Sequence, residues 1–241
     1  MGATAESPLT ERCQPAPTEP YALWHLFPVE EMRKLEAFVH GGLWCAELNS
    51  IVSFEGDTEG SQPFGFFVSC WHRSKSDPTP VAWEVFGGLG NGIALRAQPS
   101  FLKSLAKRFS ADGLRVRFDE VRYLPKGEQC SDAAFEVACS HAGEREMRLG
   151  ISVVDTPDTD DAKRKEHIRK SVPAVCLNPR AVTKFQQVTF VECDGAEAIV
   201  LPVPPGDLIM EILAGPRVRE CAKNELARML ERSELGSKIR G

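Results

Sequence analysis

The sequence lacks the short-range cysteine spacing on which many small metal and redox sites depend. Its eight cysteines include no CxxC pair, and the closest two are nine positions apart. We therefore expect neither a zinc ribbon nor a thioredoxin-type redox site. The thiols are interpreted as free in a reducing cytosol, serving mainly as small apolar core side chains.

Long apolar runs and a basic excess are also missing. No run approaches the roughly 18 residues that a membrane-spanning helix needs, and the first residues do not resemble a secretory signal. The net charge is −5, whereas proteins that bind phosphate backbones need a basic surface. We expect a cytoplasmic protein that does not bind membranes and whose main partner is not nucleic acid.

Standard nucleotide-binding and hydrolase motifs are absent as well. There is no P-loop, no Rossmann fingerprint, no HExxH and no GxSxG. The segment GGLGNG, residues 87–92, lacks the Lys-Ser/Thr ending of a phosphate loop and precedes a predicted strand, where such a loop would precede a helix. No metal-ligand spacing is found, so no metal site is predicted and a metal-dependent nuclease is only a weak third alternative.

What the sequence does contain is a mixture of strand and helix patterns. Leu114–Tyr123 and Met147–Val153 alternate apolar and polar residues, which predicts half-buried strands. Phe101–Phe109 has its apolar residues at helical spacing. Since strands outnumber helices and the two do not alternate regularly, we predict an α+β fold with a largely antiparallel sheet.

The predicted organisation is one domain with two simple ends. Residues 1–19 are rich in Pro, Ala, Thr and Glu and predict a disordered arm, whereas residues 236–241 predict a flexible basic tail. The single α+β domain is expected over residues 20–235. Its centre is expected at Phe64–Arg96, where Trp, His, Cys and Gly residues are unusually dense.

The most chemically suggestive cluster is Glu144, Glu146 and Arg148. Residues at i, i+2 and i+4 of a strand point to the same face, so the two carboxylates and the guanidinium are predicted to lie together. Such a set can act as an acid, a base or an electrostatic stabiliser. The alternative is a solvated strand edge, with the charges pointing outward opposite Met147 and Leu149.

Two histidines and a tryptophan are further candidates. His25 and His72 each stand beside a tryptophan, and histidine handles protons near neutral pH. The simpler interpretation is a hydrogen-bonded structural histidine. Trp83, which precedes the glycine-rich segment, is either a core anchor or a stacking floor for a flat ligand ring.

The order of short motifs resembles an uncharacterised bacterial family, domain of unknown function 2971. The motifs are FVSCWH, AWEVF, GIAL, VRYL, ExExR and ILAGPR, and the resemblance runs from Tyr21 to Ser233. The chain departs from the family pattern at Phe86, where the family has Tyr, and after Asn49, where Asp-Pro-x-Glu is missing. The matching residues are Cys70, Trp71, His72, Trp83, Gly92, Ile93, Ala94, Leu95, Glu144, Glu146 and Arg148.

A more remote resemblance is to the layout of ADP-ribosyltransferases, through the LWH start, the aromatic centre and the late ExE strand. It implies that His25 binds NAD and that Trp71 or Trp83 stacks on the nicotinamide. It also implies that Glu146 is catalytic and that Glu144 orients the acceptor. A fixed carboxylate stabilises the oxocarbenium-like transition state that forms as nicotinamide leaves.

Two functional hypotheses follow. The first is an intracellular effector or toxin-like enzyme, as used in phage defence, with NAD as substrate for ADP-ribosyl transfer or hydrolysis and no assigned cofactor. The second is a non-catalytic binding or regulatory module, with a nucleotide or a protein as partner, in which the Glu144/Glu146/Arg148 set is a structural salt-bridge network. The enzyme hypothesis requires Glu146, His25 and Trp83 to converge on one pocket.

Overall fold

The computed structural model describes a large part of the chain. The described residues are 21–48, 65–111, 114–124, 132, 134–138, 145–152, 161–172, 174–176, 186–193, 196–231 and 233–240. The predicted N-terminal arm, residues 1–19, and the candidate residue Glu144 lie outside them.

Helices and strands follow one another in mixed order, and the predicted single α+β domain is confirmed. The elements are β1 (Ala22–Pro28), η1 (Val29–Glu31), α1 (Met32–Val39), β2 (Gly42–Glu47), β3 (Phe66–Ser74), α3 (Pro80–Val85), η2 (Gly88–Gly90), β4 (Gly92–Ala97), α4 (Pro99–Ala111), β5 (Arg115–Glu120), β6 (Arg122–Leu124), β7 (Glu136–Ala138), β8 (Glu146–Ser152), α5 (Asp161–Ser171), β9 (Ala174–Cys176), β10 (Thr189–Cys193), β11 (Ala196–Pro202), α6 (Pro205–Leu208), β12 (Ile209–Ala214), α7 (Glu220–Glu231), η5 (Gly236–Lys238) and β13 (Ile239–Arg240).

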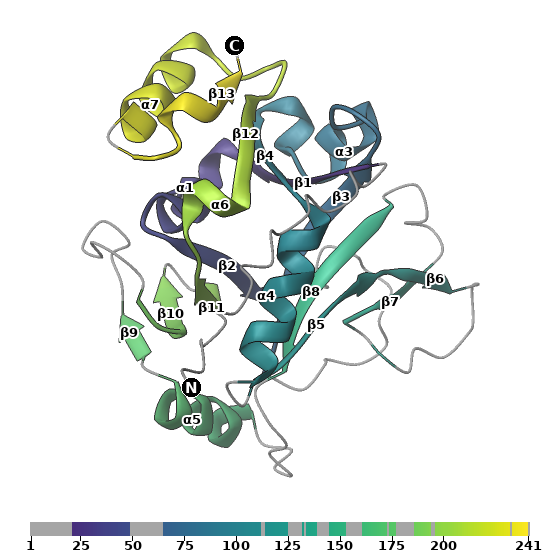
Figure 1. The fold of residues 1–241 in the computed structure, drawn as a ribbon, viewed down its shortest axis with the longest axis vertical. Coiled ribbons are helices and arrows are strands. Elements are labelled where there is room, and N and C mark those ends of the chain that lie inside the picture. The colour runs from purple at the N-terminus through teal and green to yellow at the C-terminus, as the bar shows by residue number, and fades with distance from the viewer. Residues whose placement is uncertain are drawn as a thin grey trace, which may run out of the picture.

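The large sheet branches at β3, inside the stretch that the sequence marks as central. Strand β8 pairs antiparallel with β3 from Phe66 to His72. On the other edge of β3, β2 pairs with its first half and β1 with its second half. From there the sheet continues through β4 and β12 on one side and through β11 and β10 on the other (Figure 1). Most described strand pairs are antiparallel, as predicted.

One face of the sheet, called here the core face, carries the main hydrophobic core. Leu23, Phe67, Trp71 and Leu149 from β1, β3 and β8 are fully buried on it. Apolar side chains of α1, α4, α6 and α7 pack against them, and Figure 1 shows α4 lying across this part of the sheet. The helical spacing of Phe101, Leu102, Leu105 and Phe109 is thereby explained.

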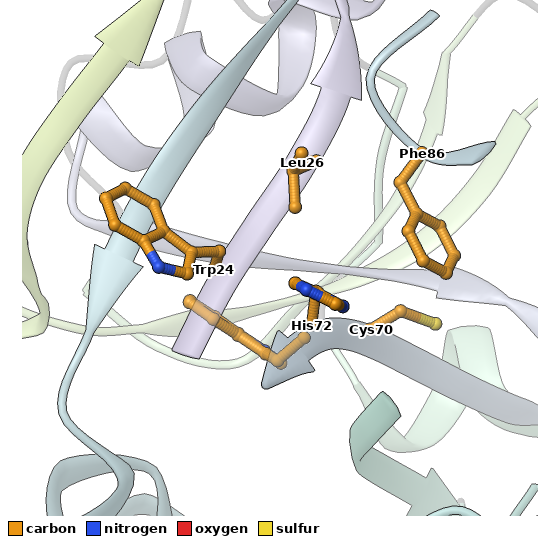
Figure 2. Close-up of a pocket in the computed structure, with 6 residues that line it drawn as sticks. Trp24, Leu26, Cys70, His72 and Phe86 are labelled. Carbon is orange, nitrogen blue, oxygen red and sulfur yellow. The ribbon is translucent and has the colours of Figure 1, made fainter. Parts of the chain in front are cut away.

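The opposite face, called here the second face, is also covered. Trp24 and Leu26 of β1 pack there with Ala82 of α3. Cys70 and His72 of β3 lie beside them, under Phe86, as Figure 2 shows. These side chains leave a space too small for a water molecule, so this part of the second face is a packed layer.

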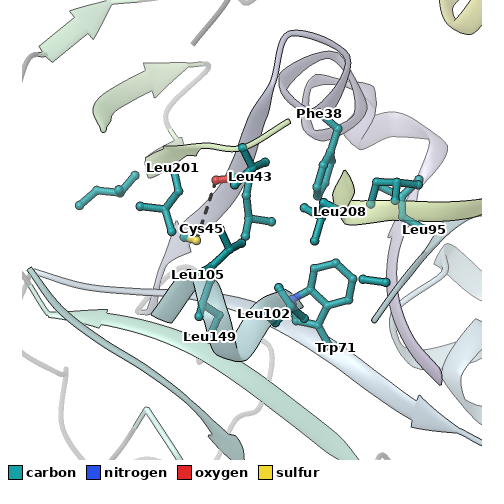
Figure 3. Close-up of a cluster of buried hydrophobic side chains, with 14 of the residues drawn as sticks. Phe38, Leu43, Cys45, Trp71, Leu95, Leu102, Leu105, Leu149, Leu201 and Leu208 are labelled. Atoms are coloured by element: carbon teal, nitrogen blue, oxygen red, sulfur yellow. Dashed lines mark hydrogen bonds between the residues drawn. The ribbon is translucent and has the colours of Figure 1, made fainter. Parts of the chain in front are cut away.

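Three cysteines among the described residues are free thiols, namely Cys45, Cys70 and Cys221. Cys45 belongs to the main core, with Sγ 4.0 Å from the Leu43 carbonyl oxygen (Figure 3). Burial raises the pKa of the Cys45 thiol well above its ordinary value, so this thiol remains protonated. Cys45 therefore acts as the small apolar core side chain that the sequence predicts.

The C-terminal part of the domain differs from the sequence prediction at one point. Before α7 begins at Glu220, the N–H groups of Gly215 and Arg217 donate to the carbonyls of Gly92 and Gly90. Residues 236–240, expected to be a flexible tail, form η5 and the short strand β13. Strand β13 pairs parallel with β12, and Arg240 forms ion pairs with Asp77 and Glu211.

Candidate functional site

Glu146 and Arg148 come together on β8, as the sequence predicts. Arg148 Nε donates to Glu146 Oε1 at 2.8 Å, and Arg148 Nη2 donates to Glu146 Oε2 at 2.9 Å. Each side chain is only 1% exposed. The two groups thus form a bidentate ion pair in the protein interior, the geometry in which arginine binds a carboxylate most specifically.

The pair belongs to the second face and is held from several directions. Cys70 and His72 lie opposite Arg148 and Glu146 in the β3–β8 register. Arg148 Nη1 donates to the Ala134 carbonyl at 3.3 Å, and the Glu146 backbone N–H donates to the Tyr123 hydroxyl at 3.1 Å. The alternative of outward, solvated charges on β8 is therefore wrong, because Ala134 and its neighbours cover this face.

His25 and Trp71 lie on the core face, on the other side of the sheet. Their ring centroids are 5.2 Å apart, and both rings are buried beside Phe38 of α1. His25 Nδ1 donates to the Cys70 carbonyl at 2.8 Å. Among the described residues, His25 Nε2 and Trp71 Nε1 have no hydrogen-bond partner.

Trp83 occupies a third place. It is half-buried on α3 and packs with the second-face cluster around Trp24. Its side chain also lies against Gly87 and Gly215, so closely that a Cβ at Gly87 would approach the Trp83 ring to 2.5 Å. The glycine-rich turn thus provides packing space for Trp83, which is the core-anchor alternative of the sequence prediction.

The five described candidate residues consequently do not form one constellation. Glu146 and Arg148 share the second face, and His25 and Trp71 share the core face. The backbone of the sheet separates these two groups, since His25 is flanked in β1 by two residues of the second face. Trp83 contacts the glycine-rich turn, and Glu144 lies outside the described residues.

A cavity that no sequence pattern predicts lies next to the Glu146–Arg148 pair. Its volume is about 350 Å³, within the range typical of small-molecule sites. It lies between β5, the start of β6 and the segment that precedes β7. It is lined by Arg117, Asp119, Glu120, Val121, Arg122, Asp132 and Phe135.

The cavity wall carries charges of both signs, and most of them are paired. Arg117 Nη2 lies 2.5 Å from Asp132 Oδ2. Arg122 pairs with the buried Glu136, and Glu120 pairs with Arg73 of β3.

Asp119 is the exception. Its Oδ1 accepts only the N–H of the adjacent Glu120, at 2.8 Å. Among the described side chains none forms an ion pair with this carboxylate, although Asp119 lines the cavity.

The strand that forms the floor of the cavity, β5, is paired with β8, which carries the Glu146–Arg148 ion pair. Asp119 lies opposite Arg148 in the β5–β8 register, and Arg117 lies opposite Gly150. The Phe135 ring covers Gly150, and the Arg117 guanidinium lies 3.7 Å from the centroid of that ring. The buried pair and the Phe135 ring therefore fix the position of the charged wall.

Replacement of Gly150 by alanine tests this floor. A Cβ at Gly150 would approach Cε2 and Cζ of Phe135 to 2.8 and 2.9 Å, so the ring must move. We expect a loss of about 1–3 kcal/mol in the free energy of unfolding, as is typical of overpacking. Urea unfolding measures it, and the double variant Gly150→Ala/Phe135→Leu should recover part of the loss. No recovery would contradict contact with Phe135 as the cause.

Sequence patterns missed the cavity for a local reason. Arg117 and Asp119 occupy the polar positions of an alternating strand, where charged residues are ordinary. Nothing in the pattern shows that the short segment around Phe135 folds over this strand. Among the described residues no group of three His, Cys, Asp or Glu side chains is arranged to hold a metal ion, and no described helix is long and apolar enough to cross a membrane.

Comparisons with known proteins add no relative to this description. No protein-family model, no curated protein sequence and no solved structure matches the chain.

Proposed function

We propose that this chain is a non-catalytic binding or regulatory module whose ligand site is the cavity between β5, β6 and Phe135. The observation that carries the proposal is the state of Glu146. Both of its oxygens receive hydrogen bonds from Arg148, and the carboxylate is 1% exposed. A catalytic carboxylate would have to reach a ribose, whereas this one serves as a buried structural group.

The layout of the remaining candidates supports the same proposal. An NAD site would need His25 and Glu146 on one side of the sheet, but they point to opposite faces. The motifs that resemble the domain of unknown function 2971 family are compatible with the proposal, because Cys70, His72, Glu146 and Arg148 lie side by side where they build one packed layer. ADP-ribosyl transfer or NAD hydrolysis is the competing hypothesis.

Release of nicotinamide from NAD distinguishes the two hypotheses. We expect no release above the uncatalysed rate, either by the wild-type chain or by Glu146→Gln. The measurement is chromatographic quantification of nicotinamide at a high protein concentration, with a known NAD glycohydrolase as positive control. Release by the wild type that is lost in a folded Glu146→Gln variant would overturn the proposal.

A further inference from the structure

The charged wall of the cavity indicates the chemistry of its ligand. Asp119 offers a carboxylate oxygen without an ion-pair partner among the described residues. Arg117 and Arg122 each use Nη2 for their ion pairs, whereas a guanidinium has five N–H donors. The wall thus combines a negatively charged hydrogen-bond acceptor, the Asp119 carboxylate, with N–H donors of two positively charged guanidinium groups that their ion pairs do not use.

The size of the cavity limits the ligands that it can hold. A volume of about 350 Å³ is near the lower end of small-molecule sites, which run from roughly 300 to 1,000 Å³. Apolar side chains contribute little surface to the cavity wall, because Val121 is only 3% exposed and Phe135 only 5%. Such a site suits a compact ligand that is held mainly by charge-assisted hydrogen bonds.

From these observations we infer that the cavity binds a small zwitterion of the α-amino-acid class. Its ammonium group pairs with Asp119, and its carboxylate accepts hydrogen bonds from Arg117 and Arg122. This inference rests on the proposed function and names the ligand of the same site. The polar ends of the ligand would replace water at charged groups that are already positioned by Asp132, Glu136 and Phe135, so little reorganisation is needed.

The first experiment is a binding screen with the full chain. The twenty L-amino acids are added singly at about 10 mM, a concentration that reveals dissociation constants in the millimolar range or below, and the melting temperature is recorded. We expect a subset to raise it. The absence of any increase would overturn the inference.

The second experiment tests the two ends of the ligand. For the amino acid with the largest effect, calorimetry compares it with its decarboxylated amine and its deaminated carboxylic acid. Loss of one charge-assisted contact is expected to weaken binding about 10- to 100-fold. If the amine binds as tightly as the amino acid, the arginines have no role in recognition and the inference fails.

The third experiment tests the residue that carries the inference. Asp119 is exposed and holds no other side chain, so Asp119→Asn is expected to keep the melting temperature of the free protein while binding falls at least about tenfold. Glu84→Gln on α3 is a matched control, because it removes one exposed negative charge outside the cavity. Unchanged affinity in Asp119→Asn would overturn the inference.

These outcomes are separable from the test of the proposed function. If NAD is cleaved and Glu146 is required, the binding-module proposal fails whatever Asp119 does. If NAD is not cleaved and the amino acids do not bind, only the ligand class is wrong.

Discussion

Replacement of Arg148 by methionine is expected to lower the free energy of unfolding by about 3–5 kcal/mol, the cost of leaving a buried charge without its partner. In the wild type, Glu146 is 1% exposed and both of its oxygens bind Arg148. Methionine fills a similar space but donates no hydrogen bond. The Glu146 carboxylate is then left buried without the guanidinium that binds both of its oxygens.

A double variant distinguishes this cause from a loss of packing. In Glu146→Met/Arg148→Met both charges are absent, and replacement of a whole buried pair by apolar side chains is often neutral or stabilising. We therefore expect the double variant to be more stable than Arg148→Met alone, which urea unfolding can show as a coupling free energy. A double variant that loses the sum of both single losses would contradict a structural ion pair.

The control for this cycle is an exposed arginine. Arg228 lies on the solvent side of α7, and Arg228→Met should change the free energy of unfolding by no more than about 0.5 kcal/mol. The comparison isolates burial, since the chemical change is the same at both positions.

Acidification from pH 7 to pH 4 is expected to cost about 3 kcal/mol of stability through His25 alone. The pKa of His25 falls from 6.5 to about 4, chiefly because the ring is buried and also because Lys34 is near, against the opposing effects of the Cys70 carbonyl and Glu31. His25 Nδ1 already donates to Cys70, so an added proton must go to Nε2. That atom is buried without a partner among the described residues.

The direction of this effect follows from the two pKa values. Below pH 6.5 the unfolded chain binds a proton at His25, whereas the folded chain does so only below about pH 4. Falling pH therefore favours unfolding throughout this window, and His25 adds no further dependence below it or above pH 7. Urea unfolding of the wild type and of His25→Gln across pH 4–7 measures the difference. Parallel curves for the two proteins would refute the role of His25.

Much of the fold could be predicted because periodicity reports burial directly. The alternation in Leu114–Tyr123 and Met147–Val153 predicted the strands found as β5 and β8, and the helical spacing in Phe101–Phe109 predicted the apolar side of α4. The same alternation wrongly predicted that the polar side of β8 faces solvent. Periodicity cannot distinguish a charge in water from a charge neutralised by a neighbour, and Arg148 is buried because Glu146 accompanies it.

The candidate site could be predicted from sequence periodicity even less completely than the fold. The sequence brought Glu146 and Arg148 together because they share one strand. It could not tell that His25 points away from them, since that depends on the register between β1 and β3. The cavity depends on Asp132 and Phe135, in a segment too short to show any period.

The branching of the sheet at β3 also governs the order in which the chain can fold. One edge of β3 pairs with β1 and β2, which precede it in the chain. The other edge pairs with β8, which follows some eighty residues later. Pairings of such sequence separation are slow to form, because loop closure costs entropy before contacts compensate it. During synthesis the first half of this protein therefore emerges with an open sheet edge. An N-terminal fragment that ends before β8 therefore cannot close this edge of β3.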